Sequence, residues 1–87
     1  MKTLHLTLKR IYFDQILSGE KTREYRERKP YWVKRFFEKQ YMQVLFTNGY
    51  THDRPWMLVE LKSIEDDYEH GRYILQLGKI INKGNIA

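Results

Sequence analysis

Apolar and polar residues alternate at the start of the chain, which is the pattern of a strand with one buried face. Leu4, Leu6 and Leu8 alternate with polar residues, so we predict a half-buried strand with its leucines inward. Over residues 10–18 the apolar side chains recur three and four positions apart, which predicts a short amphipathic helix. Gly19 follows at once and suits the left-handed conformation that ends many helices.

The next two segments are a polar strand and an aromatic helix. Residues 21–28 alternate like a strand, yet neither face is hydrophobic, so we expect this strand at a sheet edge or along a wet groove. Residues 30–39 have the pattern of a helix that begins at Pro30. The helix has an apolar stripe of Trp32, Val33, Phe36 and Phe37, and we expect the aromatic residues of this stripe to pack in the core rather than to stack on bases.

Strand-like segments dominate the second half of the chain. Residues 41–47 form one, and the Asn48-Gly49 pair that follows is a strong turn signal. Residues 56–64 have the highest β character, so we predict that they form a central strand. The rest of the chain predicts an acidic turn at 65–71, a last strand at 73–77 whose continuation through 80–81 stays open, and a loose tail over 83–87.

Strands outnumber the two short helices, which predicts the α+β class and a small, strongly bent sheet or open barrel. We expect a single domain over residues 1–87, because a chain of 87 residues builds only one modest core. The absence of cysteine rules out disulfides and thiolate metal sites. No apolar run approaches the roughly 20 residues of a membrane span, and we expect a cytoplasmic protein without a membrane partner.

Positive charge is concentrated in one segment, residues 21–39. Its eight Lys and Arg and three Glu give it a net charge of +5, equal to the net charge of the whole chain. Five aromatic residues lie in the same span. Clustered cations with aromatic surface suit a polyanion that carries stackable bases, so nucleic acid is the first partner to consider. The alternative is a solvated basic strand followed by a helix with core aromatics.

Within this segment, residues 19–26 form the pattern G-x-K-x-x-E-x-R at the end of an amphipathic helix and the start of a strand. This pattern resembles the signature of the ASCH domain family, a branch of the PUA-like RNA-binding superfamily. The leading strand LHLTL, the helix YFDQILSG, the strand LVELKSI and the closing YILQLGKII also resemble that family, so the likeness covers about residues 4–81. The resemblance implies a PUA-like pseudo-barrel with the motif lining a cleft beside the first helix.

The motif residues Lys21, Glu24 and Arg26 can be interpreted without the family. Glu24 and Arg26 share one strand face, where an acceptor and a bidentate donor can meet the edge of a nucleobase. Lys21 follows the helix end, where its ammonium can reach phosphate or, if desolvated, act as a base or nucleophile. The alternative is an ion-pair ladder that only holds a polar strand in place, worth roughly 0.2–1 kcal/mol.

Some small relatives in the ASCH family are amidohydrolases that act on N4-acetylcytidine, and others are reported as ribonucleases. For the amidohydrolases the resemblance implies a catalytic lysine, a threonine three residues later and a glutamate on a late strand. Lys21 matches the first and Glu60 is a candidate for the third. Glu24 stands at the threonine position, and a carboxylate cannot replace a hydroxyl donor unless it is protonated. This departure weakens the case for deacylation.

Three hypotheses follow. The first is an ASCH-type module that binds RNA or a nucleotide through Lys21, Glu24 and Arg26, with phosphate contacts from Arg23, Arg28, Lys34 and Arg35. The second is a small enzyme that acts on modified nucleosides or RNA with Lys21 and Glu60 as catalytic groups. The third is a protein-interaction adaptor with a patch around Tyr31 and Trp32. No cofactor is expected, and the widely spaced histidines make a metal site improbable.

Overall fold

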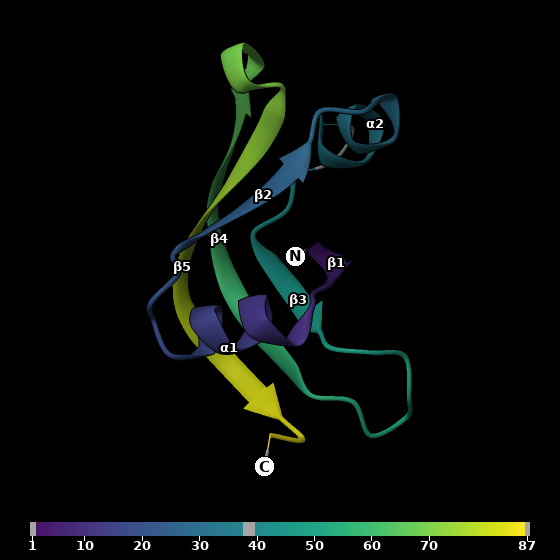
Figure 1. Cartoon of the computed structure of the whole chain (residues 1–87), viewed down its shortest axis with the longest axis vertical. Coiled ribbons are helices and arrows are strands. Elements are labelled where there is room, and N and C mark those ends of the chain that lie inside the picture. The colour runs from purple at the N-terminus through teal and green to yellow at the C-terminus, as the bar shows by residue number, and fades with distance from the viewer. Residues whose placement is uncertain (1, 38–39, 87) are drawn as a thin grey trace.

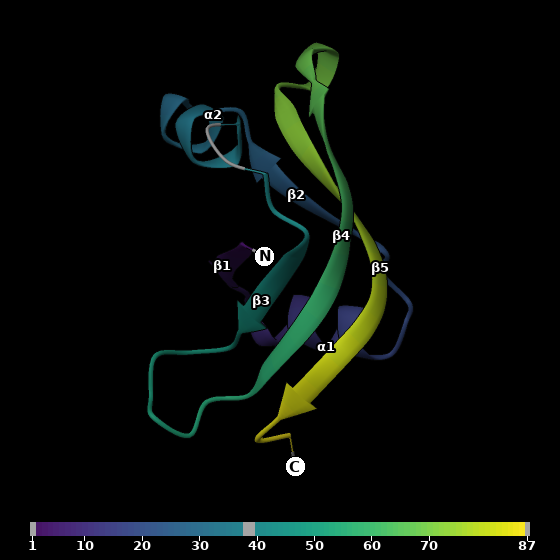
Figure 2. The same cartoon turned by 180° about the vertical axis from the view of Figure 1, so that it is seen from behind.

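The computed structural model describes residues 2–37 and 40–86, and it has a curled sheet with two helices. Its five strands form one mixed sheet in the order β1-β3-β4-β5-β2. The sheet bends into a half-barrel, with α1 lying against the β4–β5 hairpin and α2 near the end of β2 (Figure 1, Figure 2). This confirms the α+β class. The elements are β1 (Thr3–Thr7), α1 (Arg10–Leu17), β2 (Arg23–Glu27), α2 (Pro30–Phe37), β3 (Gln43–Thr47), β4 (Trp56–Asp67), a 3₁₀ turn (Tyr68–His70) and β5 (Arg72–Gly84).

The core lies on the inner face of the curled sheet, beneath α1. The alternation predicted for the first strand is confirmed, because Leu4, Leu6 and Leu8 are all buried. β1 pairs in parallel with β3, which places its leucines beside the inward side chains of that strand. The helix α1 contributes Phe13 and Ile16, and Gly19 after it has the expected positive φ of +85°. The remaining core residues are Phe36, Val44, Phe46, Met57, Val59, Leu61, Tyr73, Leu75 and Leu77.

The strand β4 occupies the centre of the sheet, as predicted, but it is longer than the sequence indicated. The expected acidic turn over residues 65–71 was wrong in its first part, because Glu65, Asp66 and Asp67 continue β4 and pair with β5. Their charges do not end the strand because they lie on a projecting hairpin, where Asp67 binds Arg72 at 2.8 Å. The chain reverses only through the 3₁₀ turn and Gly71, whose φ is +64°.

The last strand also runs further than expected. β5 continues through residues 80–81 to Gly84, so the predicted tail was wrong for residues 83 and 84, while residue 87 lies outside the described part. β2 pairs with β5 only over Arg72–Gln76, and the amide of Leu77 then donates to the Thr22 carbonyl. Within the described chain, the outer edge of β5 from residue 78 onward pairs with no strand. Its inner pairing with β4 contains register shifts typical of β-bulges.

The helix α2 buries less of its apolar stripe than we expected. Phe36 is buried and stacks on Tyr73 edge-to-face, and Trp32 is partly buried against the core. Phe37 is 52% exposed, so its assignment to the core was wrong, and Val33 of the same stripe is 40% exposed. An eight-residue helix at the rim of a half-barrel contacts the sheet with one side only. Lys39, the end of the expected helix, lies outside the described residues.

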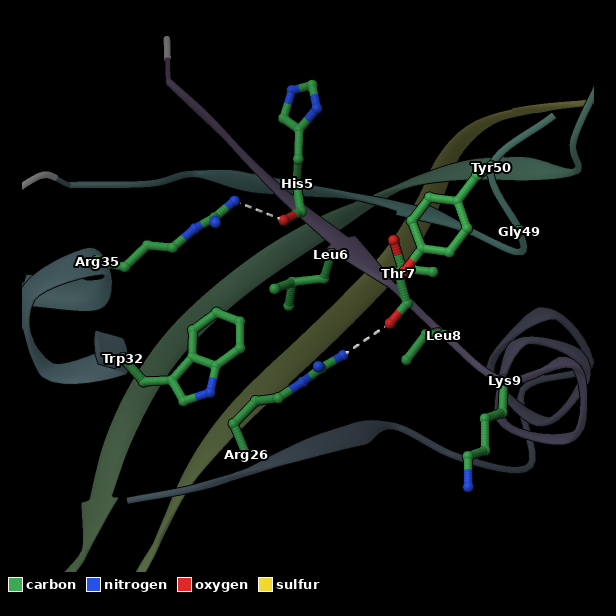
Figure 3. A pocket seen from close by; sticks show the side chains of 10 residues that line it. All are labelled: His5, Leu6, Thr7, Leu8, Lys9, Arg26, Trp32, Arg35, Gly49 and Tyr50. Carbon is green, nitrogen blue, oxygen red and sulfur yellow. Dashed lines mark hydrogen bonds between the residues drawn. The ribbon is translucent and has the colours of Figure 1, made fainter. Parts of the chain in front are cut away.

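The strand β2 lies at one edge of the sheet, as the polarity of its sequence predicted, and β1 lies at the other. The curl of the sheet brings these two edges to the same side of the molecule, where side chains rather than a strand pair connect them (Figure 1, Figure 3). No helix in the described residues has the length and apolar character that crossing a membrane requires.

Candidate functional site

The motif residues form a connected set of charges at the start of β2. The carboxylate of Glu24 is 7% exposed and accepts from Lys21 Nζ and from Arg26 Nη2, each at 3.0 Å. The turn at Gly19 positions Lys21, whose backbone amide donates to the Gln15 carbonyl at the end of α1. Each carboxylate oxygen of Glu24 therefore has a cationic partner. The two hydrogen bonds order Lys21 and Arg26 before any ligand arrives.

Lys21 lies among aromatic rings. Its Nζ is 4.5 Å from the centroid of the Tyr12 ring and 5.7 Å from that of Tyr25. Carboxylate and π faces are the partners that an ammonium selects. Lys21 also lines a small hollow of about 290 Å³, which we call the Lys21 hollow, together with Gln15, Glu20, Thr22, Arg23 and Tyr25.

Arg26 extends from β2 across to the opposite sheet edge. Its Nη2 donates to the Thr7 carbonyl of β1 at 3.1 Å in addition to Glu24. Its Nε is buried without a hydrogen-bond partner in the described structure. A buried donor without a partner costs roughly 1–3 kcal/mol, against which the two hydrogen bonds of Nη2 hold the Arg26 side chain in place.

A second arginine binds the same edge of β1. Arg35 of α2 donates from Nη2 to the His5 carbonyl and from Nη1 to the Tyr31 hydroxyl, both at 2.8 Å. Neighbouring residues of a strand direct their backbone groups to opposite sides, and Leu8 donates to the Thr47 carbonyl on the β3 side. His5 and Thr7 therefore present their backbone groups away from β3, toward the two arginines.

Between this edge of β1 and the helix α2 lies a groove of about 550 Å³, which we call the β1 groove (Figure 3). Trp32 lies between the two arginines, with its ring centroid 5.5 Å from Arg26 Cζ and 5.7 Å from Arg35 Cζ. Tyr50, which is 87% exposed, closes the far side from the loop after β3. That loop is attached to β1 by Asn48, whose side-chain amide donates to the Leu8 carbonyl at 2.9 Å.

A second depression of about 400 Å³ adjoins the β1 groove and shares Thr7, Leu8, Lys9, Arg26 and Trp32 with it. The additional lining residues are Tyr12, Glu24, Tyr25 and Glu27. The joined surface therefore changes from guanidinium and indole at one end to carboxylate and phenol at the other. Such a surface can bind an anion at the first end and donor groups at the second.

The predicted phosphate-contacting residues are divided among three surfaces. Arg35 lines the β1 groove and Arg23 lines the Lys21 hollow. Arg28 and Lys34 line another depression of about 440 Å³ with Lys29, Pro30 and Val33, which we call the α2 hollow. Arg28 also binds Asp66 through two hydrogen bonds of 2.9 and 3.2 Å.

The pKa values of two side chains near the hairpin tip, Arg28 and Asp67, differ from their ordinary values. The pKa of the Arg28 guanidinium is raised, chiefly by its hydrogen bond to Asp66. The pKa of Asp67 is lowered, first by its hydrogen bond with His70 and then by that with Arg72. Across residues 2–37 and 40–86, His, Asp and Glu side chains do not gather in groups of three that could hold a metal ion.

Lys21 and Glu60, the two catalytic groups of the enzyme hypothesis, do not interact with each other within the described part of the chain. No hydrogen bond or ion pair connects Glu60 with Lys21 in the described residues, and Lys21 Nζ is bound to Glu24. Glu60 lies between the buried Val59 and Leu61 of β4, and its carboxylate packs over Gly78 where a Cβ atom would overlap it.

The β1 groove contains residues that the sequence analysis missed. Lys9 and Tyr50 line it, and Trp32, which we expected to be a core residue, faces it while resting on Phe36. The sequence contains no signal for Tyr50, which is a single aromatic residue after the Asn48-Gly49 turn and belongs to no periodic pattern. Tyr31, the other residue of the proposed adaptor patch, is 61% exposed beside Trp32.

Comparisons with known proteins do not classify the chain. No protein-family model matches it. No curated protein and no solved structure matches it either.

Proposed function

We propose that the protein binds RNA or a nucleotide in the β1 groove, as a PUA-like module of the ASCH type. The observation that carries the proposal is the placement of Trp32 between Arg26 and Arg35 in a groove of about 550 Å³. An indole gives a base a surface on which to stack, and two guanidiniums give the attached phosphate its counter-charge.

The lining of the adjoining depression supports the same ligand class. Glu24 and Glu27 would repel a phosphate there, but carboxylates accept hydrogen bonds from a ribose hydroxyl or an exocyclic amine. The ligand would therefore lie with its phosphate toward Arg35 and its sugar or base toward Glu24. Arg26 lines both depressions and so lies between these ends.

The test is a fluorescence anisotropy titration of a labelled single-stranded hexauridylate, with Arg35→Gln as the groove variant. Removing one charge-assisted hydrogen bond worth roughly 1.5–3 kcal/mol should weaken binding by about tenfold or more. The salt slope should fall by about 0.7, the value for one phosphate contact on a single strand. Trp32→Phe keeps an aromatic ring on Phe36 and should weaken binding less.

The matched control is Arg10→Gln, which removes the same charge from an exposed arginine of α1 outside the groove. Its affinity should stay within about twofold of wild type. If Arg35→Gln and Arg10→Gln bind equally well, the β1 groove is not the site. Mass spectrometry of the same samples tests the enzyme alternative, since a product that disappears with Lys21→Ala would make the protein an enzyme.

A further inference from the structure

The helix α2 separates two basic depressions. Trp32 and Arg35 face the β1 groove, whereas Pro30, Val33 and Lys34 line the α2 hollow. At 100° per residue, these two sets lie on opposite sides of the helix. Just before the helix, Arg26 of β2 lines the groove, and Arg28, which follows the end of that strand, lines the hollow.

The α2 hollow has the chemistry of a site for a phosphodiester backbone. Three of its five lining residues are Arg28, Lys29 and Lys34, and the other two, Pro30 and Val33, are apolar. Asp66 already neutralises Arg28 in part, so the lysines carry most of the available charge. The pair between Lys29 and Glu27 is 3.3 Å long and highly exposed, so solvent screens it and the ammonium remains able to contact a ligand.

A single nucleotide cannot occupy both depressions. The body of a helix, about 10–12 Å across with its side chains, separates them. The groove and its adjoining depression already offer the volume, the aromatic face and the hydrogen-bonding groups that one nucleotide needs. A ligand that uses the α2 hollow as well must therefore be a chain of several phosphates.

From this placement we propose that the ligand is a single-stranded oligonucleotide that crosses α2, with one base in the β1 groove and its backbone continuing into the α2 hollow. This inference rests on the proposed function and adds the length of the ligand and a second contact surface. The hollow contributes affinity without reading sequence, because lysines contact phosphates as point charges. The charge of Lys29 and Lys34 is then needed only by ligands longer than one nucleotide.

The experiment compares labelled uridine monophosphate with labelled hexauridylate on wild type and on the double variant Lys29→Gln/Lys34→Gln. Arg28 is left intact because its bond to Asp66 ties β2 to β4. The matched control is Lys62→Gln/Lys79→Gln, which removes the same charge from two exposed lysines of β4 and β5.

We expect wild type to bind the hexamer at least tenfold more tightly than the monomer. The hollow variant should lose most of this gain, keep its affinity for the monomer and show a salt slope smaller by about 1.4, which is 0.7 for each lost phosphate contact. The control variant should keep the gain. Circular dichroism should show the same fold in all three proteins.

Other results would overturn the inference in distinguishable ways. If monomer and hexamer bind equally, or if the hollow variant keeps the whole gain, the second contact surface is wrong while binding in the β1 groove stands. If hexaglutamate displaces hexauridylate at equal concentration, the hollow takes an acidic peptide instead. If neither nucleotide binds, the proposed function fails and this inference fails with it.

Discussion

Replacing Glu24 with glutamine removes one buried negative charge and keeps the shape of the side chain. The carboxylate is 7% exposed and bonds Lys21 and Arg26 at 3.0 Å each. Glutamine has a single acceptor oxygen, so one cation keeps a neutral partner while the other faces an amide that also donates. One charge-assisted hydrogen bond of roughly 1.5–3 kcal/mol is lost and the second is weakened.

Two features limit the loss of stability. The side chain of Lys21 is 17% exposed and can regain water, and Arg26 keeps its bond to the Thr7 carbonyl. We therefore expect Glu24→Gln to lower the free energy of unfolding by about 2–3 kcal/mol, somewhat less than the 3–5 kcal/mol typical of breaking a fully buried pair. For a domain of this size the melting temperature should fall by roughly 10–20 °C.

Urea denaturation followed by tryptophan fluorescence measures this loss, because Trp32 and Trp56 are both partly buried. The control is Glu27→Gln on the same strand, whose pair with Lys29 is solvent-exposed and should contribute less than about 0.5 kcal/mol. A Glu24→Gln variant as stable as the control would show that the motif charges do not hold the fold together. Their arrangement would then serve the ligand alone.

Three further outcomes are expected. The pKa of Asp67 is lowered in the folded protein, so its carboxylate stabilises the fold above the unfolded pKa of about 4, and this stability is lost as the pH falls through the lower folded value. Asp67→Asn removes this contribution and also frees His70, so the free energy of unfolding measured between pH 6 and 2 should depend less on pH than in wild type. Leu75→Ala should lower the free energy of unfolding by about 2–5 kcal/mol in urea titrations, because Leu75 is fully buried; a loss below 1 kcal/mol would contradict that packing. Gly84→Ala should cost about 1–3 kcal/mol and shift the fluorescence of Trp56, since a Cβ there would meet the indole ring; an unchanged spectrum and stability would refute this contact.

Local patterns in the sequence predicted the elements well. The alternating leucines of β1, the left-handed Gly19 and the edge position of the polar strand β2 each follow from short-range rules, and all were confirmed. The errors arose where a partner distant in the chain decides the outcome. Glu65–Asp67 resemble a turn until their pairing with β5 is known, and Phe37 resembles a core residue until the helix meets the sheet with only one side.

Local sequence patterns predicted only part of the candidate site. The pairing of Glu24 with Lys21 and Arg26 depends on residues close in sequence, and the chemistry of the motif pointed to it. The β1 groove depends on which strand edge remains unpaired, and that follows from the order of the strands in the sheet. Residue spacing alone does not bring His5 next to Arg35, thirty positions away.

The open outer edge of β5 beyond residue 77 has a consequence for the behaviour of the protein at high concentration. An unpaired strand is a template for a neighbouring molecule, and repeated pairing leads to aggregation. Lys79 and Lys83 flank the exposed Ile81 on this edge, and the bulges distort the regular spacing that an incoming strand would need. A second copy would bring its own ammonium groups against these lysines, so their positive charge keeps the molecules apart.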